Sequence, residues 1–282
     1  MIFWIASYPK SGNTWLRSLL ASYYFSKNGE FDQLLLKNIR QFPEEQFFKD
    51  FNYNPKEITD TSRFWIPAQE KINLDNKIKF FKTHNILGAI NGSNFTNKKN
   101  TLGAIYIVRD PRNVITSLKN HYDYDYNGAL NFILNEQKYI FESDQTDDFS
   151  NFQFISSWEK NYLTWKSQNL FPLKIIKYED LLNETFFIVR EIIEFINKTC
   201  NIKTKFDKLK AKNSIQTTNF SVLKNMEKKH GFIEAVMDKK KSNKIPFFHL
   251  GADNNWQKIL NQDYQNKLNF SFKVSMKELG YI

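Results

Sequence analysis

The sequence predicts an α/β fold with a central parallel sheet flanked by helices. Four short apolar runs have the length and composition of buried strands, at residues 2–6, 78–81, 104–108 and 173–176. Three helical patterns follow such runs, at residues 13–25, 111–122 and 180–199. Strands that alternate with helices favour a parallel sheet, whose ligands gather at the carboxyl ends of the strands. The polar residues that end these runs are therefore expected to share one crevice.

The first run leads into a polar loop that opens a helix. Lys10 and Gly12 fall in this loop, and Ser11, Asn13 and Thr14 stand near the helix start. Successive backbone N–H groups and the positive end of the helix dipole make a pocket for a phosphate or sulfate group there. This P-loop-like segment predicts that the chain binds a phosphorylated nucleotide.

The loop departs from the usual ATP-binding pattern, which needs a glycine, four residues and then Gly-Lys-Ser/Thr. Ala6 stands at the early glycine position, Lys10 precedes Gly12, and Asn13 stands where the lysine is usual. A polar strand-to-helix turn without a ligand is the alternative interpretation.

Two segments interrupt the alternation of strands and helices. Residues 26–76 contain several prolines and are predicted to be a cap insertion of short helices and loops over the sheet. Residues 213–255 are mostly polar and are predicted to be irregular, forming a lid over a ligand. We expect residues 1–282 to form one domain that includes both segments.

The second strand ends in residues suited to charge neutralisation and proton transfer. Lys82 and His84 follow directly on the apolar run. Histidine is the side chain best suited to accept a proton near neutral pH. Its expected position near Lys10, across the same sheet edge, favours a catalytic histidine over a structural one.

The third strand ends in a candidate phosphate clamp. Arg109 stands at the strand tip, and Asp110 with Pro111 gives a capped helix start. Ser117 lies about two turns into that helix, and an arginine fork with a hydroxyl binds phosphate by charge-assisted hydrogen bonds. A capped helix with a merely solvated arginine is the alternative.

The composition limits the classes of function. The formal net charge of +10 fits an anionic ligand, and because no DNA- or RNA-binding motif is present we expect no nucleic acid partner. The single cysteine, Cys200, excludes an intrachain disulfide and fits a reducing compartment. No run approaches the roughly 20 apolar residues of a membrane-spanning helix, and no signal-peptide pattern is present. We expect a cytoplasmic protein without stable membrane insertion and, since the histidines show no metal-ligand spacing, without a metal.

Together the motifs resemble those of the cytosolic-type sulfotransferases, which use 3′-phosphoadenosine 5′-phosphosulfate (PAPS). Residues 8–15 resemble the family's 5′-phosphosulfate loop, and residues 109–117 resemble its 3′-phosphate motif. Residues 82–84 resemble its segment with a lysine and the catalytic histidine. Residues 178–181 resemble the region that contacts adenine, and residues 218–220 a later adenine-contacting turn.

The resemblance implies transfer of a sulfuryl group from PAPS to an acceptor hydroxyl. His84 would accept the hydroxyl proton, Lys10 would neutralise charge on the leaving oxygen, and Lys82 would support the transferring group. Ser117 would bind the 3′-phosphate and help to control Lys10. The predicted catalytic residues are therefore His84, Lys10, Lys82 and Ser117. The predicted donor-binding residues are Lys10, Ser11, Gly12, Asn13, Thr14, Trp15, Arg109, Ser117, Tyr178, Phe220, His249, Leu250 and Gly251.

The last motif departs from the family pattern. Members commonly carry Arg-Lys-Gly and then Gly-Asp-Trp in a loop that closes over the donor. Here residues 249–251 are His-Leu-Gly and residues 254–256 are Asn-Asn-Trp. The departure predicts that Arg109 and Ser117 carry more of the 3′-phosphate recognition, with His249 or Lys244 as substitutes.

The acceptor remains open, as a small molecule or a glycan or lipid hydroxyl. Residues 26–76, 142–151 and 221–248 are expected to shape its pocket. Four aromatic residues fit either an apolar acceptor wall or the cap's own small core, which is favoured for most: Phe47, Phe48, Phe51 and Trp65. For Trp15 and Phe220, contact with adenine and ordinary core packing both stay open.

Two other functions stay open. A kinase-like phosphotransferase would use Asp110 as a carboxylate that organises magnesium, although Ala6 and the position of Lys10 disfavour it. A noncatalytic protein that binds a nucleotide or a sulfated ligand is the second alternative. The oligomeric state is also open.

Overall fold

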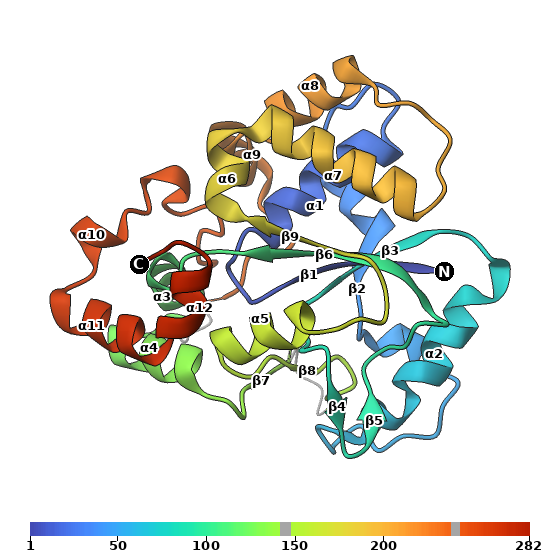
Figure 1. The fold of residues 1–282 in the computed structure, drawn as a ribbon, viewed down its shortest axis with the longest axis horizontal. Helices are drawn as coiled ribbons and strands as arrows, with labels where there is room; N and C mark the ends of the chain where they lie inside the picture. Colours follow the sequence, from blue (N-terminus) through green and yellow to red (C-terminus); the bar gives the residue numbers. More distant parts are fainter. Residues whose placement is uncertain (142–147, 238–242) are drawn as a thin grey trace.

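A five-stranded, all-parallel sheet runs through the centre of the molecule (Figure 1). The computed structural model describes residues 1–141, 148–237 and 243–282. The strand order is β2-β3-β1-β6-β9, and two antiparallel hairpins, β4-β5 and β7-β8, lie outside this sheet. The strands are β1 (Ile2–Ser7), β2 (Ile39–Gln41), β3 (Lys79–Thr83), β4 (Ala89–Ile90), β5 (Ser93–Asn94), β6 (Thr101–Val108), β7 (Tyr139–Ile140), β8 (Gln153–Phe154) and β9 (Leu173–Lys177).

Helices cover both faces of the sheet. One face packs mainly against α1, α6, α7, α8 and α9, and the other mainly against α2, α3, α4, α5, α11 and α12. The α-helices are α1 (Asn13–Phe25), α2 (Trp65–Ile72), α3 (Pro111–His121), α4 (Tyr126–Leu134), α5 (Trp158–Lys166), α6 (Tyr178–Asn183), α7 (Thr185–Thr199), α8 (Lys208–Thr217), α9 (Phe220–His230), α10 (Trp256–Ile259), α11 (Gln262–Ser271) and α12 (Lys273–Glu278).

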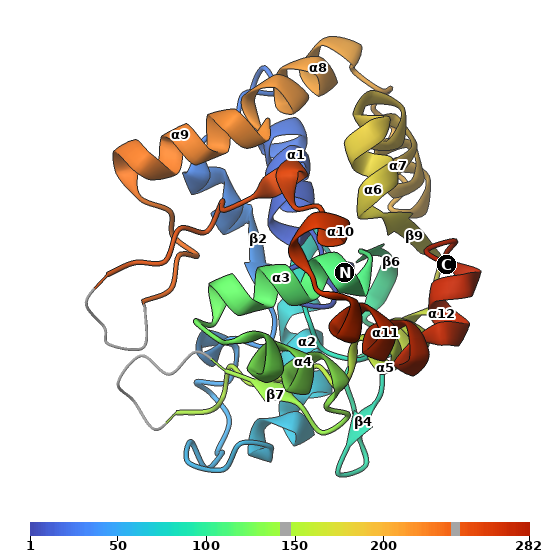
Figure 2. The ribbon, with the colours of Figure 1, turned by 90° about the vertical axis from the view of Figure 1, so that its left-hand side faces the viewer.

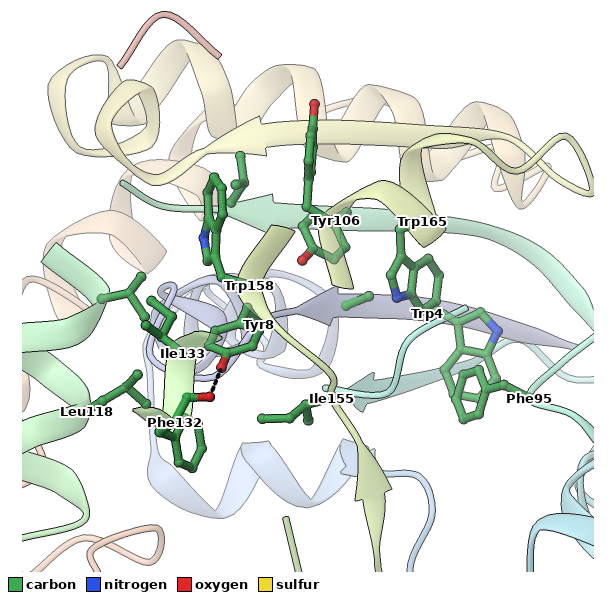
Figure 3. Packing of buried hydrophobic residues seen from close by; sticks show 14 of the residues in the cluster. Trp4, Tyr8, Phe95, Tyr106, Leu118, Phe132, Ile133, Ile155, Trp158 and Trp165 are labelled. Carbon is green, nitrogen blue, oxygen red and sulfur yellow. Dashed lines mark hydrogen bonds between the residues drawn. The ribbon is translucent and has the colours of Figure 1, made fainter. Parts of the chain in front are cut away.

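The two hydrophobic cores arise from the alternation of side chains along the strands. In β1, Phe3 and Ile5 belong to one cluster, whereas Trp4 and Ala6 belong to the other. All four are fully buried, which explains why this strand is a continuous apolar run rather than an alternating one. The second cluster is rich in large rings, and Figure 3 shows Tyr8 among them, with its hydroxyl donating to the Phe132 carbonyl oxygen at 3.4 Å.

The structure confirms the predicted fold and the four predicted strands, and it adds one strand to the central sheet and two short hairpins outside it. Residues 26–76 contain β2, which pairs with β3 and forms one edge of the sheet. Three residues are too few to show a periodic pattern, so the sequence did not predict this strand. The helix predicted over residues 180–199 is two helices, α6 and α7, because Glu184 (φ −124°, ψ 42°) leaves the helical region.

Residues 213–255 are not irregular throughout, since they include the 11-residue helix α9, whose Asn219 cap was not recognised. In the segments 142–151 and 221–248, which were expected to shape the acceptor pocket, residues 142–147 and 238–242 lie outside the described residues. Within the described ranges, no helix is both long and apolar enough to span a bilayer.

Candidate active site

The carboxyl ends of β1, β3, β6 and β9 open into one cavity of about 1520 Å³. Its lining brings together residues from segments that lie far apart in the sequence. Ser11 is fully buried in the loop and does not line the cavity. The other predicted site residues all line it: Lys10, Gly12, Asn13, Thr14, Trp15, Lys82, His84, Arg109, Ser117, Tyr178, Phe220, His249, Leu250 and Gly251.

The loop after β1 has an unusual backbone. Lys10 has φ 64° and Gly12 has φ 100°, in the left-handed region that few side chains tolerate. A Cβ at Gly12 would lie 2.5 Å from Cδ2 of Tyr178, so the glycine also lets α6 approach the loop. The sequence thus places glycine where both the turn and the packing need it.

Asn13 ties the start of α1 to β1. Its Nδ2 donates to the Ile5 carbonyl oxygen at 3.0 Å and to the Ser7 hydroxyl at 3.2 Å. Asn13 therefore holds the loop in place from within, a role that differs from the lysine usual at this position in ATP-binding loops.

His84 is held in one tautomer. Its Nδ1 lies 2.8 Å from the Ser7 carbonyl oxygen, which only accepts hydrogen bonds, so Nδ1 carries the proton. The other ring nitrogen, Nε2, then keeps its lone pair. The backbone of His84 is fixed as well, since its N–H donates to Gln153 Oε1 at 2.7 Å and its carbonyl oxygen accepts from Asn161 Nδ2 at 2.9 Å.

The surroundings keep His84 neutral. Burial, followed by the positive charge of Lys82, lowers the pKa of His84 to about 3. A neutral imidazole with a free Nε2 can accept a proton at pH 7. An anionic group bound between His84 and Lys82 would raise this pKa and make the imidazole a stronger base.

Lys10 lies in an environment that opposes its charge. Burial lowers the pKa of Lys10 to about 7; Glu234 opposes this shift, and Lys82 and Arg109 add to it. The ammonium group lies 3.9 Å from the centroid of the Phe247 ring. A bound anion would therefore raise this pKa and hold the lysine charged.

Arg109 and Ser117 meet at the end of β6. Arg109 Nη1 lies 3.5 Å from Ser117 Oγ and 3.4 Å from the Lys10 carbonyl oxygen, and its guanidinium stacks 4.1 Å above the Tyr178 ring. Ser117 Oγ also donates to the Asn113 carbonyl oxygen and accepts from Asn254 Nδ2 at 3.1 Å. The long arginine contacts leave its donors available for a stronger acceptor.

Two further aromatic rings, those of Trp15 and Phe220, line the same cavity as this clamp. Trp15 packs edge-on against Tyr178 at 5.7 Å. Phe220, at the start of α9, lies against the turn at Gly251, where a Cβ would come within 2.5 Å of the ring. With φ 58°, Gly251 also needs the left-handed region. Because Trp15 and Phe220 line the cavity and also belong to the neighbouring hydrophobic cluster, each is placed for both of its predicted roles.

The turn at residues 249–251, which departs from the family pattern, has a lysine of a neighbouring helix beside it. The carbonyl oxygen of His249 accepts from Lys224 Nζ at 2.9 Å. Burial lowers the pKa of His249, and Lys224 and Lys119 add to this shift. Lys244, the other predicted substitute, lines a separate smaller cavity and not the main one. The lysine beside this turn is thus Lys224 of α9, which the sequence did not single out. In Figure 2 the chain continues from this turn into α10, which lies beside α3.

Unsatisfied polar atoms gather around the same cavity. Eleven buried side-chain N or O atoms lack a hydrogen-bond partner among the described residues, and five belong to the loop, α1 and Arg109. Buried polar groups are normally paired, so this concentration indicates a polar ligand. The five atoms are Ser11 Oγ, Asn13 Oδ1, Trp15 Nε1, Arg17 Nε and Arg109 Nε.

Part of the cavity is lined by aromatic rings. Tyr122 and Phe132 lie 5.0 Å apart, and Tyr124 stacks on Tyr122 at 5.7 Å. Lys138 places its ammonium 4.7 Å from the Phe132 ring. All four line the cavity together with His84.

The four aromatic residues of the predicted cap do not line the main cavity. Phe48 and Trp65 are buried in the hydrophobic cluster on the α2 face of the sheet, and Phe47 and Phe51 pack against it. These four residues are therefore core residues, but they belong to the main cluster on this face of the sheet and not to a small core of the cap's own.

Several residues of the site were not predicted. Ser7 orients His84, and Asn254 contacts Ser117. Arg17 and Glu234 line the cavity beside Thr14 and Lys82. Only Arg17 had a signal in the sequence, because it lies three residues after Thr14 on the same face of α1.

Asp110, the carboxylate that a kinase-like enzyme would use to organise magnesium, is paired with another side chain. Asp110 caps α3 by accepting from the Arg112 N–H at 2.9 Å, and it forms a buried ion pair with the Arg112 guanidinium. Asp110 does not line the cavity. Across the part of the chain that the structure describes, no group of three or more His, Cys, Asp or Glu side chains is arranged to hold a metal ion.

Comparison with known proteins agrees with this architecture. The mouse sulfotransferase SULT7A1, in a crystal structure with PAP, is similar with a TM-score of 0.61 and 18% identity over 97% of this chain and 83% of that chain. Retinol dehydratase, in complex with androsterone and the inactive cofactor PAP, is similar with a TM-score of 0.59 and 14% identity over 98% of this chain and 80% of that chain. No curated protein sequence matches the chain. The family model described as the sulfotransferase domain matches residues 2–280, and the chain therefore belongs to the sulfotransferase domain family.

Proposed function

We propose that this protein transfers a sulfuryl group from PAPS to an acceptor hydroxyl. The observation that carries the proposal is the meeting of three groups in one cavity: the oriented imidazole of His84, the loop with Lys10, and the clamp of Arg109 and Ser117. Membership of the sulfotransferase domain family and the PAP-bound structural neighbours support it.

The donor would lie along the carboxyl edge of the sheet. Backbone N–H groups at residues 11–14 and the positive end of α1 are suited to the 5′-phosphate. Arg109 and Ser117 are suited to the 3′-phosphate, and Trp15 with Phe220 to the adenine ring. The unpartnered nitrogen Arg109 Nε supports a strong anionic acceptor at this end.

In the proposed reaction the acceptor oxygen attacks the sulfur atom in line with the bridging oxygen of the donor. His84 Nε2 takes the proton from the acceptor hydroxyl as the new S–O bond forms. The old S–O bond breaks, and its electron pair stays on the 5′-phosphate of the product, 3′-phosphoadenosine 5′-phosphate (PAP). Lys10 would neutralise that oxygen, and Lys82 would stabilise the sulfuryl oxygens. Ser117 would control Lys10 through Arg109, because Arg109 contacts both the Ser117 hydroxyl and the Lys10 carbonyl oxygen.

The acceptor would bind in the part of the cavity that is lined by Tyr122, Tyr124 and Phe132. Such rings favour an apolar or planar body that presents a hydroxyl to His84. The androsterone bound by retinol dehydratase supports a small apolar acceptor. A glycan or lipid hydroxyl is the broader class that the proposal includes.

The proposal also covers the setting and organisation of the protein. We expect a reducing, cytoplasmic compartment because Cys200 is a free, buried thiol. One domain is supported by the family match over residues 2–280, with residues 213–255 forming part of the donor's cover. No nucleic acid partner and no resident metal are expected.

The experiment is a labelling assay with purified protein and PAPS that carries ³⁵S, incubated with fractionated metabolite extracts. The proposal predicts a labelled product and an equal amount of PAP, with no loss on addition of EDTA. Magnesium-dependent release of ADP from ATP, without any reaction of PAPS, would favour the kinase-like alternative. Binding of PAP without label transfer to any fraction would favour a noncatalytic binding protein.

A further inference from the structure

Glu234 places a negative charge in the lining of the cavity. It lies between α9 and the turn at residues 249–251, and its side chain is 20% exposed. Its carboxylate reaches α1 and the end of β3, where the proposal places the anionic part of the donor. A carboxylate is unexpected in a site built to bind phosphate and sulfate groups.

Each oxygen of this carboxylate has partners from the donor site. Oε2 accepts from the Thr14 hydroxyl at 2.6 Å. Oε1 accepts from Arg17 and forms an ion pair with Lys82 Nζ at 3.4 Å. The sequence predicted Thr14 as a donor-binding residue and Lys82 as a catalytic residue that supports the transferring group. Two anionic oxygens shared among a hydroxyl and two cations is also the pattern that binds a phosphate or sulfate group.

Burial alone would raise the pKa of Glu234, but Lys82 and Arg17 outweigh it and hold the pKa well below its usual range. The carboxylate is therefore ionised at neutral pH. Its charge would repel a donor bound to the same cations, because interactions between charges are strong in a poorly hydrated site. Glu234 and the donor therefore compete for Thr14 and Lys82.

Arg17 belongs to the same group of contacts. It is only 4% exposed, it donates through Nη2 to the Ile39 carbonyl oxygen at 2.7 Å, and its Nε has no partner among the described residues. The contact with Ile39, in β2, fixes the guanidinium when Glu234 leaves. A buried arginine without its counter-ion is costly, so another anion must then take the place of the carboxylate.

We propose that Glu234 is an internal substitute for the anionic group of the donor, and that Arg17 is a further donor anchor which the bound phosphosulfate takes over from Glu234. The inference rests on the proposed function, since it assumes that the 5′-phosphosulfate binds beside Thr14 and Lys82. Donor binding then exchanges one anion for another on the same three groups. The Glu234 carboxylate keeps the cations paired when no donor is bound. Because the donor must displace this carboxylate, the net affinity of the protein for the donor is lower.

Glu234→Gln tests the exchange. The variant removes the charge but keeps an amide of similar size, so PAPS and PAP should bind roughly tenfold more tightly, by isothermal titration, as expected for loss of a competing charge-assisted contact. Glu191→Gln, which removes an equal charge from an exposed position of α7 outside the cavity, is the matched control and should leave the affinity unchanged. Unchanged or weaker binding by Glu234→Gln would overturn the inference.

A double-mutant cycle tests Arg17 separately. If Arg17 anchors the donor, Arg17→Gln should weaken PAP binding roughly tenfold even when combined with Glu234→Gln. If Arg17 only neutralises Glu234, the double variant will bind PAP as tightly as Glu234→Gln alone, and the anchor role is wrong.

A measurement on the unaltered protein avoids the risk that a variant misfolds. Carbodiimide labelling read by mass spectrometry should find Glu234 protected in the free protein and reactive when PAPS is bound without acceptor. Protection that persists with PAPS bound would contradict the exchange. Inorganic pyrophosphate carries two adjacent anionic groups without a nucleoside, and it separates this inference from the proposed function. If PAPS does not bind but pyrophosphate makes Glu234 reactive, the proposed donor is wrong and the inference about Glu234 holds.

Discussion

Lys10 combines a left-handed backbone with a buried ammonium group. Burial lowers its pKa to about 7, so a large share of the molecules carry a neutral Lys10 at pH 8. A bound donor raises this pKa, because it adds negative charge beside the amine. Binding is therefore favoured below pH 7, and the affinity is lost progressively as the pH rises above it.

This linkage gives a prediction for Lys10. Binding of PAP at pH 8 should take up a proton, measured by titration calorimetry in buffers of different ionisation enthalpy. Lys10→Arg, which stays charged, should lose both the proton uptake and the fall in affinity between pH 7 and 9. A variant with the same pH dependence as the wild type would show that another group titrates.

Arg109 should distinguish donors by their 3′-phosphate. Removing its guanidinium deletes charge-assisted hydrogen bonds, so Arg109→Ala should weaken PAP binding by about 10- to 100-fold and AMP binding much less. The exposed Arg190 of α7, replaced by alanine, is the control for loss of one positive charge. Equal losses for PAP and AMP in Arg109→Ala would place the 3′-phosphate elsewhere.

At the scale of elements, the unit of strand β1, loop and helix α1 depends on Gly12. An alanine there would meet Tyr178 and would have to adopt φ 100°. We expect Gly12→Ala to lower the free energy of unfolding by about 1–3 kcal/mol and to weaken donor binding, because Tyr178 must move away from Arg109.

Gly92→Ala is the matched control for this prediction. Gly92 also has a positive φ, of 80°, but a Cβ there meets nothing within 4 Å. It therefore carries the backbone strain without the contact with Tyr178, and PAP binding should be unaffected. If the two variants lose equal stability by chemical unfolding and both keep full PAP affinity, the close approach of α6 to the loop has no role.

The elements differ in how far the sequence predicts them. The strand ends at Lys82, Arg109 and Tyr178 were predicted because each follows an apolar run, and the α3 start was predicted from its Asp110-Pro111 cap. Strand β2 was not, since its three residues form a strand only by pairing with β3. Glu234 also had no local signal, because its role depends on contacts with residues 152 and 220 positions away in the chain.

At the scale of the whole molecule, the fold holds two half-buried, neutral histidines beside the cations of the site. Burial, with Lys82 next, lowers the pKa of His84 to about 3, and burial, with Lys10 and Lys82 next, lowers the pKa of His121 to about 2. Both values lie below the usual 6.5 of an unfolded chain. The unfolded state therefore binds protons that the folded state does not as the pH falls below about 6.5.

Stability should accordingly fall as the pH is lowered from 7 to 4, in chemical unfolding experiments at fixed ionic strength. His121→Leu, which cannot bind a proton, should show a smaller loss over this range. His230→Leu, at an exposed position, is the control and should behave as the wild type does. Identical pH profiles for His121→Leu and the wild type would mean that His121 is not buried in its neutral form.

The whole-molecule claim is that this fold brings a donor site and a proton acceptor together for sulfuryl transfer. The most direct measurement compares transfer of ³⁵S from PAPS with binding of PAP, in the wild type and in His84→Gln. Our account predicts that the variant keeps its PAP affinity within about threefold while the transfer rate falls by about 10²- to 10⁴-fold. Transfer that continues undiminished in His84→Gln, or PAP binding by a wild type that never transfers the label, would contradict it.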